Sequence, residues 1–279
     1  VCTNRNRHPD LEAGQVSPMP AWAEHADSRT LRLEQRIDEK MPDGGLSAND
    51  LMDLLGDHID AHTGMERAGG GVISQASTVQ SVVFSGEERR LYLSVGEAPT
   101  GRGPYVPIEW DWDSAVGHQV HKDDAQHATP RHTPPTGSGY SRWLQASRYD
   151  MEEHDASETL RHLESACLLA PGESTYPFMA GVLCMKQDRW TDALRYLVTA
   201  TAIPQSTYRS VQARLWASRA ADACGDTEQA QQWRSEAMEA NGPHVRPLQS
   251  LVQAEQQKAV SRKRLRGLTY NIDLMDATL

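Results

Sequence analysis

The sequence predicts an α+β protein in which a mixed helix-and-strand segment precedes a helical one. Two β-rich runs separated by a polar turn lie within residues 1–113, and apolar residues recur at helical spacing from residue 140 to about 260. Between these parts, residues 114–139 are rich in His, Pro, Thr, Gly and charge and lack apolar periodicity, which is typical of a linker. Residues 261–279 are interpreted as a tail.

Composition narrows the classes of function. The 279 residues carry 28 Lys and Arg against 38 Asp and Glu, a formal net charge of −10. Because nucleic-acid binding by counterion release needs clustered cations, no nucleic-acid partner is expected. Mean hydropathy is −0.62, and no apolar run approaches the roughly 20 residues of a membrane span. The four cysteines lack C-x-x-C spacing, which favours a reducing, cytoplasmic location over a disulfide framework.

Two short helices are predicted in the front segment. Asp27-Ser28 offers an N-cap for the first helix, which Pro42 ends. The second helix is predicted within residues 47–62, because Ser47 and Asp50 have the spacing of a capping box. The apolar residues that follow on one helical face are Leu51, Leu54, Leu55 and Ile59.

A β-hairpin is predicted from residues 78–84 and 91–95, which are β-rich and joined by a polar segment with Gly86. An isolated hairpin is only marginally stable in water, so we expect these strands to join a sheet whose other strands come from elsewhere. The front segment is therefore expected to be incomplete by itself.

An internal repeat occupies residues 140–241. Equivalent positions recur after 34 and then 37 residues: Thr159, Leu163 and Ala166; Ala193, Leu197 and Ala200; Ala230, Arg234 and Ala237. Gly181 takes a position where two helices pack closely. This period resembles the tetratricopeptide repeat, which implies stacked helix hairpins that bind a protein partner. The tryptophans expected between these helices are Trp143, Trp190, Trp216 and Trp233.

Two polar residues of the front segment have the chemistry of a catalytic site. Asn4 carries a carboxamide, a donor that stabilises an oxyanion by roughly 3 kcal/mol in a transition state. Arg29 carries a planar cation that can hold a thiolate or orient a carboxylate. From spacing alone, a turn asparagine and a solvated arginine are the plainer interpretation.

Several short motifs occur in a characteristic order. They are VCTN at 1–4, Ser28-Arg29, Asp57-His58, ASTVQSVVF at 76–84 and RLYLSVG at 90–96. This order resembles the C-terminal half of the acyl-coenzyme A:6-aminopenicillanic acid acyltransferase-like (peptidase C45-type) hydrolases. These are relatives of the choloylglycine hydrolases in the N-terminal-nucleophile superfamily.

The resemblance implies an αββα sandwich that acts on linear C–N amide bonds of small N-acyl substrates, by hydrolysis or acyl transfer and without a cofactor. A cysteine freed by autoproteolysis attacks the amide carbonyl, and its own α-amino group serves as base. Asn4 would line the oxyanion hole and Arg29 would lie close to the thiol. Arg5 stands where the family often has histidine. We expect the nucleophile upstream of Val1 and interpret Cys2 as a buried strand residue.

Other clusters have plainer interpretations. The linker histidines, which are His118, His121, His127 and His132, lack a rigid scaffold for a metal. His58 and His62 have helical spacing without an H-E-x-x-H frame, which favours a place on the helix surface or in inter-helix packing, so no metal is expected. The basic run 262–266 suits a helix C-terminus. The alternative function is a non-catalytic scaffold in which the repeats bind a protein partner.

Overall fold

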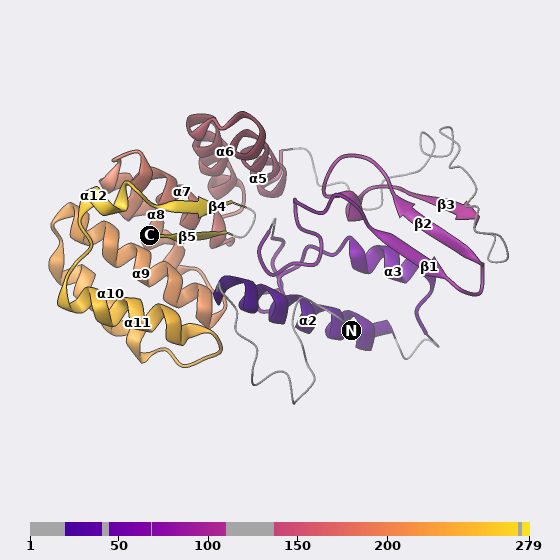
Figure 1. Ribbon diagram of the computed structural model, residues 1–279, viewed down its shortest axis with the longest axis horizontal. Helices are drawn as coiled ribbons and strands as arrows, with labels where there is room; N and C mark the ends of the chain where they lie inside the picture. The colour runs from indigo at the N-terminus through magenta and orange to yellow at the C-terminus, as the bar shows by residue number, and fades with distance from the viewer. Residues whose placement is uncertain (1–19, 41–44, 68, 110–136, 273–274) are drawn as a thin grey trace.

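The computed structural model describes residues 20–40, 45–67, 69–109, 137–272 and 275–279. Figure 1 shows a front layer of helices and a small sheet on one side and a stack of helices on the other, with one long helix between them. Asn4, Cys2 and most of the predicted linker lie outside the described residues.

The front layer consists of two helices and a three-stranded sheet. Its elements are α2 (Pro20–Lys40), α3 (Ala48–Leu55), β1 (Val82–Ser85), β2 (Arg90–Ser94), the 3-10 turn η2 (Thr100–Arg102) and β3 (Tyr105–Glu109). The predicted hairpin is confirmed, since β1 and β2 pair antiparallel with Val83 opposite Tyr92. The sequence analysis did not predict β3, which pairs antiparallel with β2 and gives the order β1-β2-β3.

The predicted start of the first helix is wrong, because α2 begins at Pro20. Proline suits the first turn of a helix, where its missing N–H would have no intrahelical partner. Ser28 therefore lies in the helix interior and is not an N-cap. Its hydroxyl lies 3.4 Å from the Glu24 carboxylate, one turn earlier.

The capping box at the start of α3 is confirmed, and the hydrogen bonds from Ser47 lower the pKa of Asp50 to about 2. The predicted extension of this helix to near His62 is wrong, because α3 ends at Leu55. After it, carboxylates accept hydrogen bonds from nearby backbone N–H groups: that of Asp57 from Ile59 and that of Asp60 from Thr63. Such side-chain turns compete with helix, so His58 and His62 do not share a helical face.

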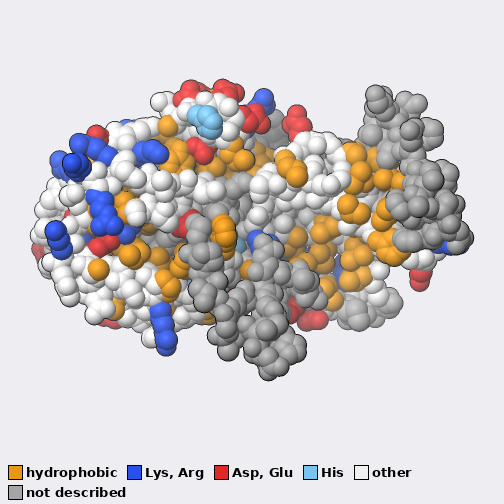
Figure 2. Space-filling model, in the orientation of Figure 1, with side chains coloured by type: hydrophobic (Ala, Val, Ile, Leu, Met, Phe, Trp, Pro, Cys, Tyr) orange, Lys and Arg blue, Asp and Glu red, His pale blue; other side chains and the backbone are white. Residues whose placement is uncertain are grey.

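The sheet is covered by α3 on one face. Met52 of α3 is buried against Val83 and Tyr105. Because side chains alternate along a strand, Val82 and Phe84 point to the opposite face. Their side chains are 51% and 50% exposed. Figure 2 shows hydrophobic side chains gathered over this part of the molecule, at the right of the view.

The second part is a stack of helices in which successive members contact each other. They are α5 (Gly139–Arg148), α6 (Ala156–Leu169), α7 (Thr175–Lys186), α8 (Trp190–Ala202), α9 (Thr207–Cys224), α10 (Thr227–Glu239) and α11 (Val245–Gln257). A π-helical turn, η3 (Tyr149–Glu153), separates α5 from α6. The second helices of the hairpins, α6, α8 and α10, begin 34 and then 37 residues apart, as the repeat predicts.

The repeated positions form the contact between paired helices. All nine are buried, including Arg234, which is ion-paired with Asp222. At Gly181, a Cβ atom would lie 2.5 Å from Leu197 Cγ, so the close packing expected there is confirmed. Three of the four tryptophans are buried, and Trp190 is half-buried.

The last residues form α12 (Arg262–Leu265), β4 (Thr269–Asn271) and β5 (Asp276–Thr278). The two strands pair antiparallel, with Tyr270 opposite Ala277. We call the described residues 265–272 and 275–278 the C-terminal strap. Figure 1 shows its strands lying across the helical stack near α7 and α9.

Within the ranges that the structure describes, none of the helices combines the length and the hydropathy needed to cross a bilayer.

Candidate functional site

A buried polar junction joins the front layer to the helical stack. The first turn of α2 is seated on α9 and α11, because fully buried Ala21 packs in one cluster with Tyr208, Leu215 and Val252. Next to this apolar contact lie charged and polar side chains of both parts. They are Glu24, His25 and Ser28 of α2, Asp60 and Arg67 of the loop after α3, Glu173 before α7, and Ser206, Arg209 and Gln212 at the start of α9.

Glu24 is the acidic centre of the junction. Its Oε1 accepts a hydrogen bond from Ser206 Oγ at 2.8 Å. Its Oε2 lies 3.7 Å from Arg209 Nε and 3.6 Å from His25 Nε2. Among the described residues this buried oxygen has no hydrogen-bond partner. Oε2 of this buried carboxylate therefore retains unused acceptor capacity.

His25 is held neutral. Its side chain is 1% exposed, and burial lowers its pKa well below 6.5, with further lowering by Arg209, Arg29 and Arg67. Nε2 contacts the Arg209 guanidinium, whereas buried Nδ1 has no hydrogen-bond partner in the described part of the chain. A neutral imidazole fits this place because three nearby cations oppose its protonation.

A run of three glycines closes one side of the junction. A Cβ atom on Gly71 would lie 2.6 Å from Ser28 Cβ, and Gly70 has φ of +72° beside His25 and Arg209. Only glycine allows both the left-handed backbone and this close approach of a loop to a helix. The GGG run at 69–71 is therefore what lets α2 and α9 contact the same loop.

Arg67 links the two parts through two carboxylates. Its NH1 lies 2.6 Å from Asp60 Oδ2 and its Nε lies 3.2 Å from Glu173 Oε1. Burial by itself would lower the pKa of Arg67, but Glu173 and Asp60 raise it above its ordinary value. Glu173 also accepts a hydrogen bond from the backbone N–H of Thr175 at 2.9 Å, so the same carboxylate caps α7.

The predicted site residue Arg29 lies on α2 at the edge of this junction. It is half-buried between two buried neighbours, Ser28 and Thr30. Burial lowers the pKa of Arg29, and the charge of Glu24 opposes this shift. Across the described ranges, no carboxylate lies within ion-pair distance of its guanidinium. The structure does not test whether Asn4 lies beside it, because Asn4 is outside the described residues.

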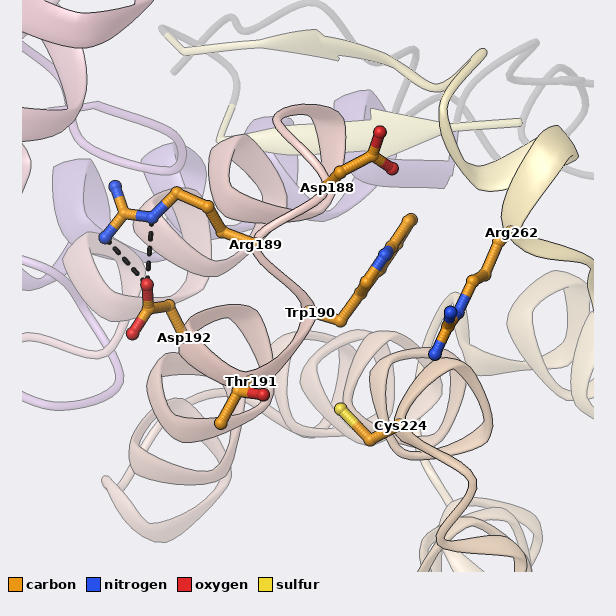
Figure 3. Close-up of a pocket in the computed structure, with 7 residues that line it drawn as sticks. All are labelled: Asp188, Arg189, Trp190, Thr191, Asp192, Cys224 and Arg262. Carbon is orange, nitrogen blue, oxygen red and sulfur yellow. Dashed lines mark hydrogen bonds and ion pairs between the residues drawn. The ribbon is translucent and has the colours of Figure 1, made fainter.

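A separate pocket of about 410 Å³ lies between the α7–α8 turn and the end of α9 (Figure 3). Its polar groups are already paired: Arg189 with Asp192 at 2.8 Å, and Arg262 with the Ala223 carbonyl. The basic run lies at a helix C-terminus as expected, in the last turn of α12, and Arg262 also donates to the Ala223 carbonyl near the end of α9. Burial raises the pKa of the Cys224 thiol, so this pocket offers no activated nucleophile.

In the portion of the chain that the structure describes, no group of three or more His, Cys, Asp or Glu residues has the arrangement of a metal site.

Arg29 was predicted from the sequence, but the charged residues of the junction around it were not. Two signals in the sequence point to them. Glu24 and Ser28 are one helical turn apart on the face that becomes buried, and the glycine run at 69–71 marks a close backbone approach. The contributions of Glu173 and Arg209 depend on the tertiary packing of distant segments and have no local signal.

The arrangement defines an α+β protein, mostly helical, with small antiparallel sheets. A comparison of the chain with protein-family models, with curated proteins and with solved structures returned no match.

Proposed function

We propose that the front layer is one α/β half of an N-terminal-nucleophile amidohydrolase or acyltransferase. The observation that carries this proposal is the half-exposed apolar side chains of β1 on the second face of the sheet. Helix α3 covers one face, while Val82 and Phe84 on the other face are half exposed. An apolar sheet face requires a partner layer, and two sheets that pack face to face with helices outside form an αββα sandwich.

Arg29 supports the catalytic part of the proposal. A half-buried guanidinium without an ion-paired carboxylate among the described residues can take a thiolate or a substrate carboxylate as its counter-ion. The α2 helix that carries Arg29 is fixed on either side of this residue, by Ala21 in the helical stack and by the ion pair of Arg32 with Asp57 at 2.7 Å. Such rigid support is what a catalytic side chain needs.

The proposed reaction uses a cysteine thiol from polypeptide that precedes Val1. The thiolate attacks the carbonyl of a small N-acyl amide, and the proton of the thiol passes to the cysteine's own α-amino group. The C–N bond breaks, the amine leaves with that proton, and the acyl group becomes a thioester. Water or a second amine then accepts the acyl group. Asn4 would donate to the oxyanion and Arg29 would hold the thiolate.

The experiment compares variants of the complete reading-frame product with N-acyl amide substrates. We expect Arg29→Ala to lower turnover by about 100-fold or more, because its cation is lost from the thiolate. Glu39→Ala is the control on the same helix, since Glu39 is exposed and forms a surface ion pair with Arg36. Wild-type turnover in a folded Arg29→Ala protein would contradict the site assignment.

Asn4→Ala is expected to lower the rate by about 100- to 1000-fold if its amide stabilises the oxyanion. An unchanged rate, with the same thermal stability as wild type, would remove Asn4 from the mechanism.

The helical stack supports a second role, which is protein binding through tetratricopeptide-like hairpins. Its second helices recur at the 34- and 37-residue spacing of the repeat, and each hairpin contacts the next. In the alternative function, a scaffold without catalysis, protein binding is the only role of the protein. Cross-linking in the source cells tests it: cross-links to a second protein from Lys186, Lys258 or Lys263 are expected, and their absence contradicts partner binding by the stack.

A further inference from the structure

Helices α7 and α9 are buried on every side. In α7, each residue from Thr175 to Met185 is buried, and in α9 the pattern continues through most of the residues from Tyr208 to Ala223. In a stack of helix hairpins, the first helix of each hairpin has one face that its neighbours do not cover. A helix that is buried on every side must therefore be covered there by another element.

The covering element is the C-terminal strap. Its apolar side chains belong to the same core cluster as those of α7 and α9. Leu265, Leu268, Ile272 and Met275 are at most 2% exposed. Residues at the far end of the sequence thus occupy the face of the stack that is otherwise free for a partner (Figure 1).

Polar contacts fix the register of the strap on α9. Arg209 donates a hydrogen bond to the Met275 carbonyl, and the Gln212 amide donates to the Asp276 carboxylate. Near its other end, the Tyr270 hydroxyl donates to Asp150. The surface under the strap therefore recognises an extended backbone carbonyl, a carboxylate and large aliphatic side chains, which is the chemistry of a peptide-binding groove.

The strap has little stability of its own. Its two strands have three residues each, and a lone two-stranded hairpin is at best marginal in water. It stays in place because it packs on α7 and α9. A connection at residues 258–261, mostly exposed, joins it to α11, so it can leave this face without unfolding the helices beneath.

We propose that the face of α7 and α9 under the C-terminal strap is a peptide-binding surface that the strap closes in cis. The partner it fits is a hairpin-forming or extended peptide with spaced aliphatic side chains followed by an acidic residue. This inference rests on the protein-binding role proposed for the stack, and it names the surface and the kind of peptide that this surface binds. Displacement of the strap also removes the Met275 carbonyl from Arg209, which still contacts His25 of α2, so partner binding alters one contact of the buried polar junction.

The test inserts a specific protease site between Ala259 and Val260 and uses a fluorescent peptide of residues 262–279 as the probe. The intact chain is expected not to bind the probe, because the surface is occupied. After cleavage, the severed strap exchanges and the probe binds saturably. Failure of the cleaved chain to bind while its helical circular dichroism is intact, or equal binding by the intact chain, overturns the proposal.

Two substituted probes check the register. Asp276→Lys places a cation beside Gln212 and Arg209 and is expected to weaken binding by 10-fold or more. Thr278→Lys makes a smaller change in charge at an exposed strand position and is expected to bind within twofold of the unchanged probe. Equal binding of both substituted probes overturns the assigned contacts.

Hydrogen exchange of the uncut chain keeps the proposal testable if cleavage unfolds the protein. Backbone amides of β4 and β5 are expected to exchange at least 10-fold faster than those of α7 and α9, because the strap opens alone. Exchange of all four elements at one rate, through global unfolding only, overturns it. These probes report on the strap surface; the partner-binding role is judged separately by the cross-links described above.

Discussion

Single buried polar residues decide how the two parts of this protein meet. Glu24, His25 and Arg209 each lie in the junction with side chains almost fully buried. The buried charges of Glu24 and Arg209 are stable only when they are paired, and His25 stays neutral beside Arg209, so each of these residues depends on the others. Their mutual dependence makes the junction sensitive to pH and to single substitutions.

The neutral state of His25 predicts a pH dependence of stability. Its folded pKa is lowered by burial and by neighbouring arginines, so the unfolded chain binds the proton more readily. Stability from this residue is therefore complete above about pH 6.5 and is lost as the pH falls below it. The free energy of unfolding should fall between pH 7.5 and pH 5.5, and His25→Gln should reduce that fall by about 1 kcal/mol. Urea unfolding at the two pH values measures this difference.

The control for this experiment is His154→Gln, because His154 is exposed. It should leave the difference in free energy of unfolding between the two pH values unchanged. The assignment fails if the two substitutions have the same effect.

Gly181 predicts a steric result at a single atom. A methyl group there would meet Leu197 Cγ at 2.5 Å, so Gly181→Ala should cost about 1–3 kcal/mol of the free energy of unfolding by overpacking. Leu197→Ala removes the clashing group, and the double variant should be more stable than the sum of the two single changes. Strict additivity in urea unfolding would show that the two residues do not touch.

At the scale of elements, the sequence predicted whether a segment is a helix or a strand better than it predicted the residues at which the element begins and ends. The capping box of Ser47 and Asp50 and the β1–β2 hairpin were local patterns, and both are present. The start of α2 was missed because Pro20 gave no apolar periodicity to follow. The end of α3 was missed because the side-chain turns at Asp57 and Asp60 compete with helix only when their backbone donors are in place.

The capping box supports a prediction for α3. Ser47→Ala removes the side-chain acceptor for the Asp50 backbone N–H and should cost about 1 kcal/mol of the free energy of unfolding. Ser77→Ala, in an exposed loop, is the matched control and should have no measurable effect. Identical midpoints of urea unfolding for the two variants would exclude a stabilising cap.

At the scale of the whole molecule, the front layer and the helical stack are joined by buried ion pairs that the sequence does not reveal. Glu173 lies 106 residues after Arg67 in the chain, so their ion pair forms only after both parts have folded. The sequence accordingly predicted the helix hairpins of the stack, whose signal is periodic. Of the residues at the junction it predicted Arg29, and this prediction came from the resemblance of short motifs to a known family.

Arg67 predicts a large effect on the assembly of the two parts. Arg67→Met leaves two carboxylates buried without their cation and should cost about 3–5 kcal/mol of the free energy of unfolding. Adding Asp60→Asn and Glu173→Gln removes those charges and should restore part of the loss. A triple variant less stable than Arg67→Met would contradict the ionic account of this contact.

The account depends most on the half-exposed apolar side chains of β1 in the front sheet, which the proposed enzyme covers with a second sheet. Hydroxyl-radical footprinting of Val82 and Phe84 measures that cover directly, by comparing the 279-residue chain with the product of the complete reading frame. We predict that both side chains are reactive in the chain and at least 10-fold less reactive in the complete product. Equal reactivity in the two proteins would contradict the layered sandwich and, with it, the proposed catalytic role of Arg29.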